Sequence, residues 1–426
     1  MWNKTKISCT SWVEFRRVKS KSRGGSMKNI VLLFFTLLVS PLAHAFRDQS
    51  VQQVQWLVVG AGPAGIATIG VLHDLGVPYE LIAWVDPDFN VGRVGEFYGT
   101  VPANNNNKQF IDFVNACATF KECQGEAVEK LRHEDPASFA ELNIMIPALR
   151  ELSAYLRTKL ISYQGWLQDL HFSGQTWCSV VNDRKIHANY VVLATGSHPR
   201  ELNYKDVSVI PLDHALDKNT LSSYIDKNNT IGVIGGSHSA ILILKYLYEL
   251  EVKKIINFYR SPIVYTVDMG TWSLNAIAGL KGTVAKWARE VLEGPTPPKN
   301  IYRIYNDGAA LEKYLPECNK IVYAVGFEPN DTPLTSEHQP VTYNDANGII
   351  APRLFGIGIA FPEIYVDPSN GTIDHRVGLK SFMDYAQRLI PQWVHGLGSN
   401  LEERTRLAKQ KCILEQFADL FAIDLL

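Results

Sequence analysis

Short apolar runs of the kind that form buried strands recur along the chain, and two of them lead directly into glycine-rich turns. The first run covers 55–59 (QWLVV) and the second covers 230–234 (TIGVI). A helical pattern of apolar residues follows each turn, at 66–75 and at 241–250. Strand, glycine turn and helix in this order form the nucleotide-binding unit of doubly wound α/β folds. The pattern therefore predicts two such units in one chain.

The turn after the first strand has the sequence GAGPAG. Its first glycine permits a tight turn, its second lets a pyrophosphate approach the backbone, and its third allows the helix to pack closely on the strand. The free N–H groups at the start of the helix would bind the phosphates. A glycine turn without a ligand is the alternative, which the flanking strand and helix disfavour. The predicted dinucleotide contacts are Gly60, Gly62, Pro63, Ala64 and Gly65.

A further strand is predicted at 79–85, directly before Asp86. An acidic residue at the end of this strand binds the ribose hydroxyls of a dinucleotide. Asp86 comes somewhat later in the chain than is usual for that role, and an aspartate before a proline is also typical of a turn. Both interpretations, ribose ligand and turn residue, remain open at this stage.

The second turn has the sequence GGSHSA, in which a serine stands where the pattern calls for close backbone approach. A serine N–H and hydroxyl can still donate to phosphate. The next predicted strand, 254–259, ends at Arg260. A base in this position accommodates the 2′-phosphate of NADPH, whereas an acid would favour NADH, so we expect NADPH; an exposed charge without a ligand is the alternative. The predicted contacts are Gly235, Gly236, Ser237, His238, Ser239 and Arg260.

The first turn and its surroundings resemble the FAD site of flavoproteins with two dinucleotide-binding domains. That group includes flavin-containing monooxygenases and pyridine nucleotide-disulfide oxidoreductases, and the resemblance extends from about residue 54 to residue 394. It implies that the run 190–197 (YVVLATGS) passes close to FAD. It also implies that 320–330 is the second crossing, where the chain leaves the NAD(P) domain, and that 354–359 is the terminal strand of the FAD domain. Residues 92–97 and the asparagine loop after them also resemble a segment that lies beside the flavin in this group. Ordinary turns and core packing would explain these residues equally well. The cofactor contacts implied are Asn104, Ala194, Thr195, Gly196, Gly326 and Gly358.

Cysteine spacing argues against disulfide chemistry. The chain has six cysteines and no CxxC pair. Cys117 and Cys123 would lie roughly 240° apart on a helix, so we expect buried free thiols there. Ile359 stands where disulfide-reductase relatives have an aspartate near the flavin. We also expect no metal site.

The expected function is that of an FAD-dependent NAD(P)H oxidoreductase acting on oxygen or a small substrate, with a monooxygenase as one form. The flavin carries such chemistry itself, so no catalytic residue is predicted. His214 is a candidate for nicotinamide or oxygen chemistry, and a structural histidine is the alternative. A nucleotide-binding protein without turnover, such as a redox sensor or partner-binding module, is the alternative function.

The expected fold is α/β, with two Rossmann-like three-layer domains and the NAD(P) domain inserted into the FAD domain. The FAD domain would cover 50–225 and 324–396, the NAD(P) domain 226–323, and an amphipathic helical tail 397–426. That tail suits packing on a neighbour, such as a second copy of the chain. Lys plus Arg number 42 against 43 Asp plus Glu. This balance gives no support for nucleic-acid binding.

Residues 1–45 read as an N-terminal extension followed by a signal peptide. From Met27 the chain has a positive start, an apolar run at 30–39, and an Ala-His-Ala site ending at Ala45. The run is too short to span a bilayer comfortably. Cleavage after Ala45 would leave an exported protein without a membrane span. A buried helix or membrane anchor is the alternative, and an unprocessed chain would be cytoplasmic.

Overall fold

The computed structural model describes residues 51–204, 206–269, 273–275, 279–332, 342–366, 371 and 373–395. The predicted signal peptide and C-terminal tail lie outside these residues. None of the described helices is long and apolar enough to cross a membrane.

The first sheet has eight strands, with a parallel core in the order β17-β6-β1-β2-β3. β16 pairs antiparallel at one edge, and β4 and β5 extend β6 as an antiparallel meander. Because the five core strands are parallel, their carboxyl ends lie along one edge, where ligands bind in such folds. The strands are β1 (Gln52–Val59), β2 (Ile82–Asp86), β3 (Ile161–Gln164), β4 (Leu167–Phe172), β5 (Trp177–Val181), β6 (Arg184–Leu193), β16 (Ile349–Ala351) and β17 (Leu354–Gly356).

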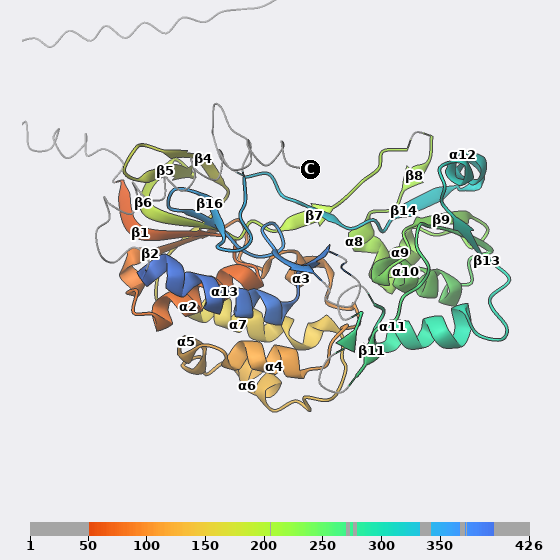
Figure 1. Ribbon diagram of the computed structural model, residues 1–426, viewed down its shortest axis with the longest axis horizontal. Helices are drawn as coiled ribbons and strands as arrows, with labels where there is room; N and C mark the ends of the chain where they lie inside the picture. Colours follow the sequence, from red (N-terminus) through yellow and green to blue (C-terminus); the bar gives the residue numbers. More distant parts are fainter. Residues whose placement is uncertain are drawn as a thin grey trace, which may run out of the picture. The chain divides into compact units, whose positions relative to one another are not determined.

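Helices cover one face of this sheet and the meander covers the other (Figure 1). The alternation of side chains along β1 explains how both faces are buried. Trp56 and Val58 point into the core under the helices, whereas Leu57 and Val59 point into the core under the meander. The helices are α2 (Pro63–Asp74), α3 (Gly92–Phe97), α4 (Lys108–Asn115), α5 (Ala118–Lys121), α6 (Glu126–Arg132), α7 (Ile146–Arg157) and α13 (Leu379–His395), with 3-10 turns at Tyr79–Leu81 and Leu142–Ile144.

The second sheet is wholly parallel, in the order β13-β10-β9-β14-β8. One core packs α10 and α11 against it, and a second core on the opposite face includes Leu311 of α12. The strands are β8 (Ser208–Val209), β9 (Thr230–Ile234), β10 (Lys254–Tyr259), β13 (Ile301–Tyr305) and β14 (Lys320–Tyr323). The helices are α8 (Leu212–Ala215), α9 (Lys218–Ser223), α10 (His238–Glu249), α11 (Gly282–Trp287, extended by a π-helical turn to Leu292) and α12 (Ala309–Tyr314), with a 3-10 turn at Leu315–Glu317.

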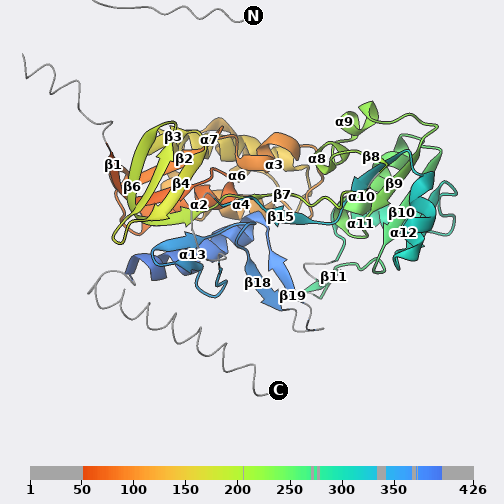
Figure 2. The ribbon, with the colours of Figure 1, turned by 90° about the horizontal axis from the view of Figure 1, so that it is seen from above.

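The chain leaves the first sheet and returns to it through two adjacent strands. β7 (Ser197–Pro199) leads out, β15 (Phe327–Pro329) leads back, and the two pair antiparallel (Figure 2). The second sheet is thus inserted between β6 and β16 of the first. This confirms the predicted fold class, two Rossmann-like units with one inserted in the other. Two further hairpins are β11 (Val267–Asp268) with β12 (Ser273–Leu274), and β18 (Glu363–Val366) with β19 (Ile373–Arg376).

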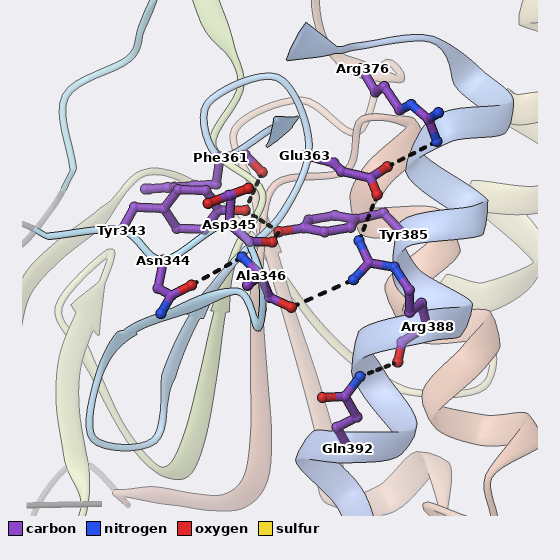
Figure 3. Close-up of polar contacts among 10 residues, drawn as sticks. All are labelled: Tyr343, Asn344, Asp345, Ala346, Phe361, Glu363, Arg376, Tyr385, Arg388 and Gln392. Atoms are coloured by element: carbon purple, nitrogen blue, oxygen red, sulfur yellow. Dashed lines mark hydrogen bonds and ion pairs between the residues drawn. The ribbon is translucent and has the colours of Figure 1, made fainter. Parts of the chain in front are cut away.

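Polar side chains fix the part of the chain that follows β15 to α13 (Figure 3). The hydroxyl of Tyr343 lies 2.5 Å from that of Tyr385 on α13, and burial raises the pKa of Tyr343. Glu363 accepts a hydrogen bond from Arg388 of α13 at 2.7 Å and pairs with Arg376 of β19 at 3.5 Å. These contacts hold the stretch that contains β17 and the glycine loop after it.

The predicted strand at 79–85 is wrong in its first three residues. Tyr79–Leu81 form a 3-10 turn, and the strand begins at Ile82. Pro78, in an extended conformation, starts this turn, and no hydrophobic alternation distinguishes the turn from the strand. Both helices after the glycine turns also begin three residues earlier than predicted, at Pro63 and His238.

Candidate functional site

The first glycine turn is closely packed at Gly60 and Gly65 and open at Gly62. A Cβ at Gly60 would lie 2.2 Å from the carbonyl oxygen of Ala194, and one at Gly65 would lie 2.0 Å from that of Gly60. A Cβ on Gly62, by contrast, would have no atom nearer than the backbone carbonyl oxygen of Val91, at 4.0 Å. Gly62 caps α2, and no side chain caps the N–H groups of this helix. The turn therefore has room and donors for a phosphate.

Asp86 is held by the backbone around it. Its carboxylate accepts from the N–H groups of Ala61 at 2.6 Å, Phe89 at 2.6 Å and Asp88 at 3.0 Å. The side chain is buried, and burial raises its pKa. This geometry favours the turn interpretation, and the ribose role of Asp86 stays a prediction. Asp88, two residues on, is exposed beside the same cavity; sequence reasoning missed it, although the DPD motif contains both acids.

A cavity of about 1150 Å³ runs from the first glycine turn to the start of α10. It places residues of both turns on one continuous wall. The predicted contacts that line it are Gly60, Gly62, Pro63, Asp86, Asn104, Ala194, Thr195, Gly196, His238 and Ser239. The predicted contacts outside its lining are Ala64, Gly65, Gly235, Gly236, Ser237, Arg260, Gly326 and Gly358.

Several of the residues outside the lining shape the turns instead. Gly358 has a positive φ of 90°, and a Cβ there would lie 2.8 Å from the Cβ of Ala64. The loop after β17 thus packs on the start of α2. Gly326 also has a positive φ, 96°, at the point where the chain returns towards the first sheet. These glycines serve the backbone path, and no other residue type fits at Gly358 without displacing α2.

Three polar atoms of residues in the cavity wall are buried without a partner. These are Oγ1 of Thr195, Nε2 of His238 and Nε of Arg93, which have no hydrogen-bond partner among the described residues. Buried polar atoms in proteins are nearly always paired, so such atoms in a cavity wall suit contact with a ligand. Burial also lowers the pKa of His238, which favours a neutral imidazole at the start of α10.

The second turn repeats the backbone geometry of the first. Gly235 has a φ of 139°, and a Cβ there would lie 2.2 Å from the carbonyl oxygen of Ala324. A Cβ at Gly236 would lie 3.1 Å from that of Tyr259, the last residue of β10. The exposed Arg260 therefore follows directly after a residue that packs on the turn. Ser237 caps α10 without a capping bond from its side chain.

The segment that leaves the first sheet and the segment that returns to it are hydrogen-bonded to each other beside the cavity. Asn330 donates to the carbonyl oxygen of Thr195 at 2.8 Å, and its Oδ1 lies 3.0 Å from Nδ1 of His198. Asn330 and His198 both line the cavity. Sequence reasoning placed the segment but did not select these residues, because their pairing depends on the contact between β7 and β15.

An ion pair joins α3, which follows β2, to α8 of the second unit. Arg93 of α3 pairs with Asp213 of α8, and the hydroxyl of Tyr98 donates to Asp213 at 2.5 Å. Arg93 and Tyr98 line the cavity. His214, proposed for redox chemistry, does not line it, and its Nδ1 lies 2.6 Å from the hydroxyl of Tyr224. The geometry thus favours the structural alternative for His214.

The four described cysteines are free and lie away from the cavity lining. Burial raises the pKa of Cys117 to about 12 and also raises that of Cys123. A thiol of such pKa is a poor nucleophile. The prediction of buried free thiols at these two positions is confirmed.

Residues 54–355 match the family model described as pyridine nucleotide-disulphide oxidoreductase. This match covers more than half of the chain. The chain belongs to the pyridine nucleotide-disulphide oxidoreductase family. Its function is accordingly that of an FAD-dependent oxidoreductase that also uses a nicotinamide nucleotide, as predicted.

Individual relatives agree with this family assignment. The chain is 32% identical over 392 residues to the monooxygenase AgnR1 of Paecilomyces divaricatus, covering 80% of this chain and 98% of that protein. Among solved structures, a flavin-containing monooxygenase from Stenotrophomonas maltophilia matches with a TM-score of 0.55 at 15% identity, over 82% of this chain and all of that one. A bacillithiol disulfide reductase from Staphylococcus aureus matches with a TM-score of 0.54 at 12% identity, over 81% and 99%. The two structures share the fold of this family member.

The geometry of the first turn fits FAD. The open space before Gly62 would take the pyrophosphate, the N-terminus of α2 would bind it, and the unpaired hydroxyl of Thr195 would face the ligand. FAD in such a site supplies the redox chemistry, taking a hydride from a reduced nicotinamide. The residues of this cavity wall would bind the two nucleotides and orient their reacting rings.

Proposed function

We propose that this protein is a flavin monooxygenase that takes electrons from NADPH and uses dioxygen to oxygenate a small molecule. The observation that carries the proposal is the cavity itself. It extends from the first glycine turn to His238 and Ser239 at the start of α10, and none of the described cysteines lines it. A disulfide reductase needs a reactive thiol pair within reach of its flavin. Electrons leaving the flavin in this cavity would therefore pass to oxygen and a small substrate.

The likeness to the monooxygenase AgnR1 supports the same proposal. So does the polar character of part of the cavity wall. Asn104, Gln109 and His198 are hydrogen-bonding side chains on that wall, and such groups can orient a small polar substrate. Nε2 of His238 would accept or donate one hydrogen bond to the nicotinamide or to that substrate.

We propose NADPH as the preferred nucleotide, on the position of Arg260. It follows the strand end that packs against the second turn, where the 2′-phosphate of a bound nucleotide would lie. A guanidinium forms charge-assisted, bidentate contacts with phosphate.

We also propose export with cleavage after Ala45. N-terminal sequencing of the protein from its native host tests this proposal. A mature chain that retains residues 30–39 would contradict it.

Oxygen incorporation tests the monooxygenase proposal. The purified holoprotein is given NADPH and isotopically labelled dioxygen in the presence of candidate nucleophilic and carbonyl substrates. The proposal predicts a product that carries one labelled oxygen atom, with NADPH consumed in equal amount. A control reaction replaces the substrates with a small disulfide. NADPH-dependent reduction of the disulfide without oxygen uptake, abolished by thiol alkylation, would contradict the proposal.

A further inference from the structure

Trp166 differs from every other tryptophan that the structure describes. It is 71% exposed, whereas the other five are at most 8% exposed and belong to the hydrophobic cores: Trp56, Trp84, Trp177, Trp287 and Trp393. Exposing a large aromatic side chain forgoes the burial free energy that normally holds it inside. A lone exposed tryptophan at the wall of a cavity therefore suits a ligand that covers it. Trp166 does line the cavity that contains the first glycine turn.

The turn that carries Trp166 is fixed to its neighbours. Gly165 donates its N–H to the carbonyl oxygen of Asp86 at 2.9 Å, which ties the end of β3 to the end of β2. Gly165 has a φ of 156°, and a Cβ there would lie 2.7 Å from the side chain of Asn182. Asn182 in turn donates to the carbonyl oxygen of Gln164 at 2.8 Å. The backbone thus presents Trp166 from a set position.

The order of the strands gives the place of each part of a bound dinucleotide. β1, β2 and β3 are parallel neighbours, so their carboxyl ends lie side by side. The pyrophosphate lies at the turn after the first of these strands and the ribose at the end of the second. The base attached to that ribose then extends towards the end of the third strand. Trp166 is the second residue after the end of β3.

We propose that Trp166 binds the adenine of FAD by stacking its indole on the purine ring. This inference rests on FAD occupying the first turn and adds the residue that would recognise its adenine. Stacking needs an aromatic face with no competing neighbour, and the exposed indole provides one. The acidic residues of the same cavity wall, Asp86 and Asp88, would be left for the ribose and the turn. A partner protein covering Trp166 is the competing explanation, and it predicts no dependence on adenine.

Flavin release from the full-length holoprotein tests the proposal. Wild type, Trp166→Ala, Trp166→Phe and a control, Tyr302→Ala, are diluted, and free FAD is followed by its fluorescence. Tyr302 is 49% exposed and lies on β13 of the second sheet. Removing a base–aromatic stack should weaken FAD binding by about five- to 150-fold in Trp166→Ala. Trp166→Phe should stay within a few fold of wild type, and Tyr302→Ala should match wild type.

Competition by FMN, which has no adenine, supplies a readout that a merely structural role would not change. In Trp166→Ala the FMN concentration that displaces half of the FAD should fall by the same factor as the FAD affinity. Equal loss of FMN and FAD binding would mean that the variant damages the site generally, and would overturn the proposal. So would a Trp166→Ala protein that holds FAD as tightly as wild type.

Tryptophan emission gives a second readout in the same proteins. The difference in emission between wild type and Trp166→Phe should be small with FAD bound and should grow when FAD dissociates, because adenine stacking quenches the indole. An unchanged difference would overturn the proposal. A wild-type protein that binds no FAD at all would overturn the flavin assignment itself, whereas the other adverse results concern Trp166 alone.

Discussion

The two glycine turns have the same backbone geometry but present different groups to the cavity. A Cβ at Gly60 or at Gly235 would lie 2.2 Å from the carbonyl oxygen of the alanine that directly follows the neighbouring strand. The first turn then leaves open space before Gly62, whereas the second places Ser237 at the cap and His238 in the cavity wall. The shared backbone geometry forms the strand-to-helix turn in both units. The different groups at the two turns determine what can approach each of them.

This difference suggests a division of labour between the turns. A bare backbone lets a pyrophosphate come close to several N–H groups, which suits a cofactor that stays bound. Side chains at the second turn would hold a nucleotide by fewer and more adjustable contacts, which suits one that binds and leaves in each cycle. Substitutions that exchange or remove these features test that account.

The largest effect is expected from filling the open space of the first turn. Gly62→Val should weaken FAD binding by at least about a hundredfold, since each charge-assisted bond to the pyrophosphate is worth about 1.5–3 kcal/mol. The FAD content of the purified protein and its release on dilution measure this. The fold should survive, because the nearest atom to a Cβ at this position is 4.0 Å away. Full FAD occupancy in this variant would contradict the inference that the open space before Gly62 admits the pyrophosphate.

A smaller effect is expected at the second turn. Arg260→Ala should reduce the efficiency of NADPH by on the order of tenfold and leave that of NADH nearly unchanged, because Arg260 is exposed and one such contact with phosphate is worth about 1.5 kcal/mol. Rapid-mixing measurements of flavin reduction by each nucleotide provide the test. An equal loss for both nucleotides would show that Arg260 does not read the 2′-phosphate.

The smallest effect concerns His238, a partly buried residue whose Nε2 atom is buried. Burial lowers its pKa from the ordinary 6.5, so the folded protein binds fewer protons than the unfolded chain as the pH falls through that value. Stability should therefore decrease below about pH 6.5, by at most about 1.4 kcal/mol per pH unit for one group. His238→Gln should remove this part of the acid sensitivity. Urea unfolding of both proteins between pH 5 and 8 measures it, and identical pH profiles would contradict it.

Much of this arrangement could be predicted from local sequence. The strands 230–234 and 254–259 were predicted with their observed bounds, because each is an apolar run that ends at a turn. The glycine turns were found because their spacing reports a local backbone path. Trp166, Asp88 and Asn330 were not found, since their place beside the cavity depends on pairing between segments far apart in the chain. Nothing in the local pattern shows that β3 lies next to β2.

The central claim is that the two turns serve one cavity, so that a nicotinamide bound at the second reduces a flavin bound at the first. Anaerobic rapid mixing of the FAD-loaded protein with NADPH tests it most directly. The account predicts loss of the oxidised flavin's visible absorbance, with a rate that saturates as the NADPH concentration rises. A protein that holds FAD but is reduced by neither NADPH nor NADH would contradict the account.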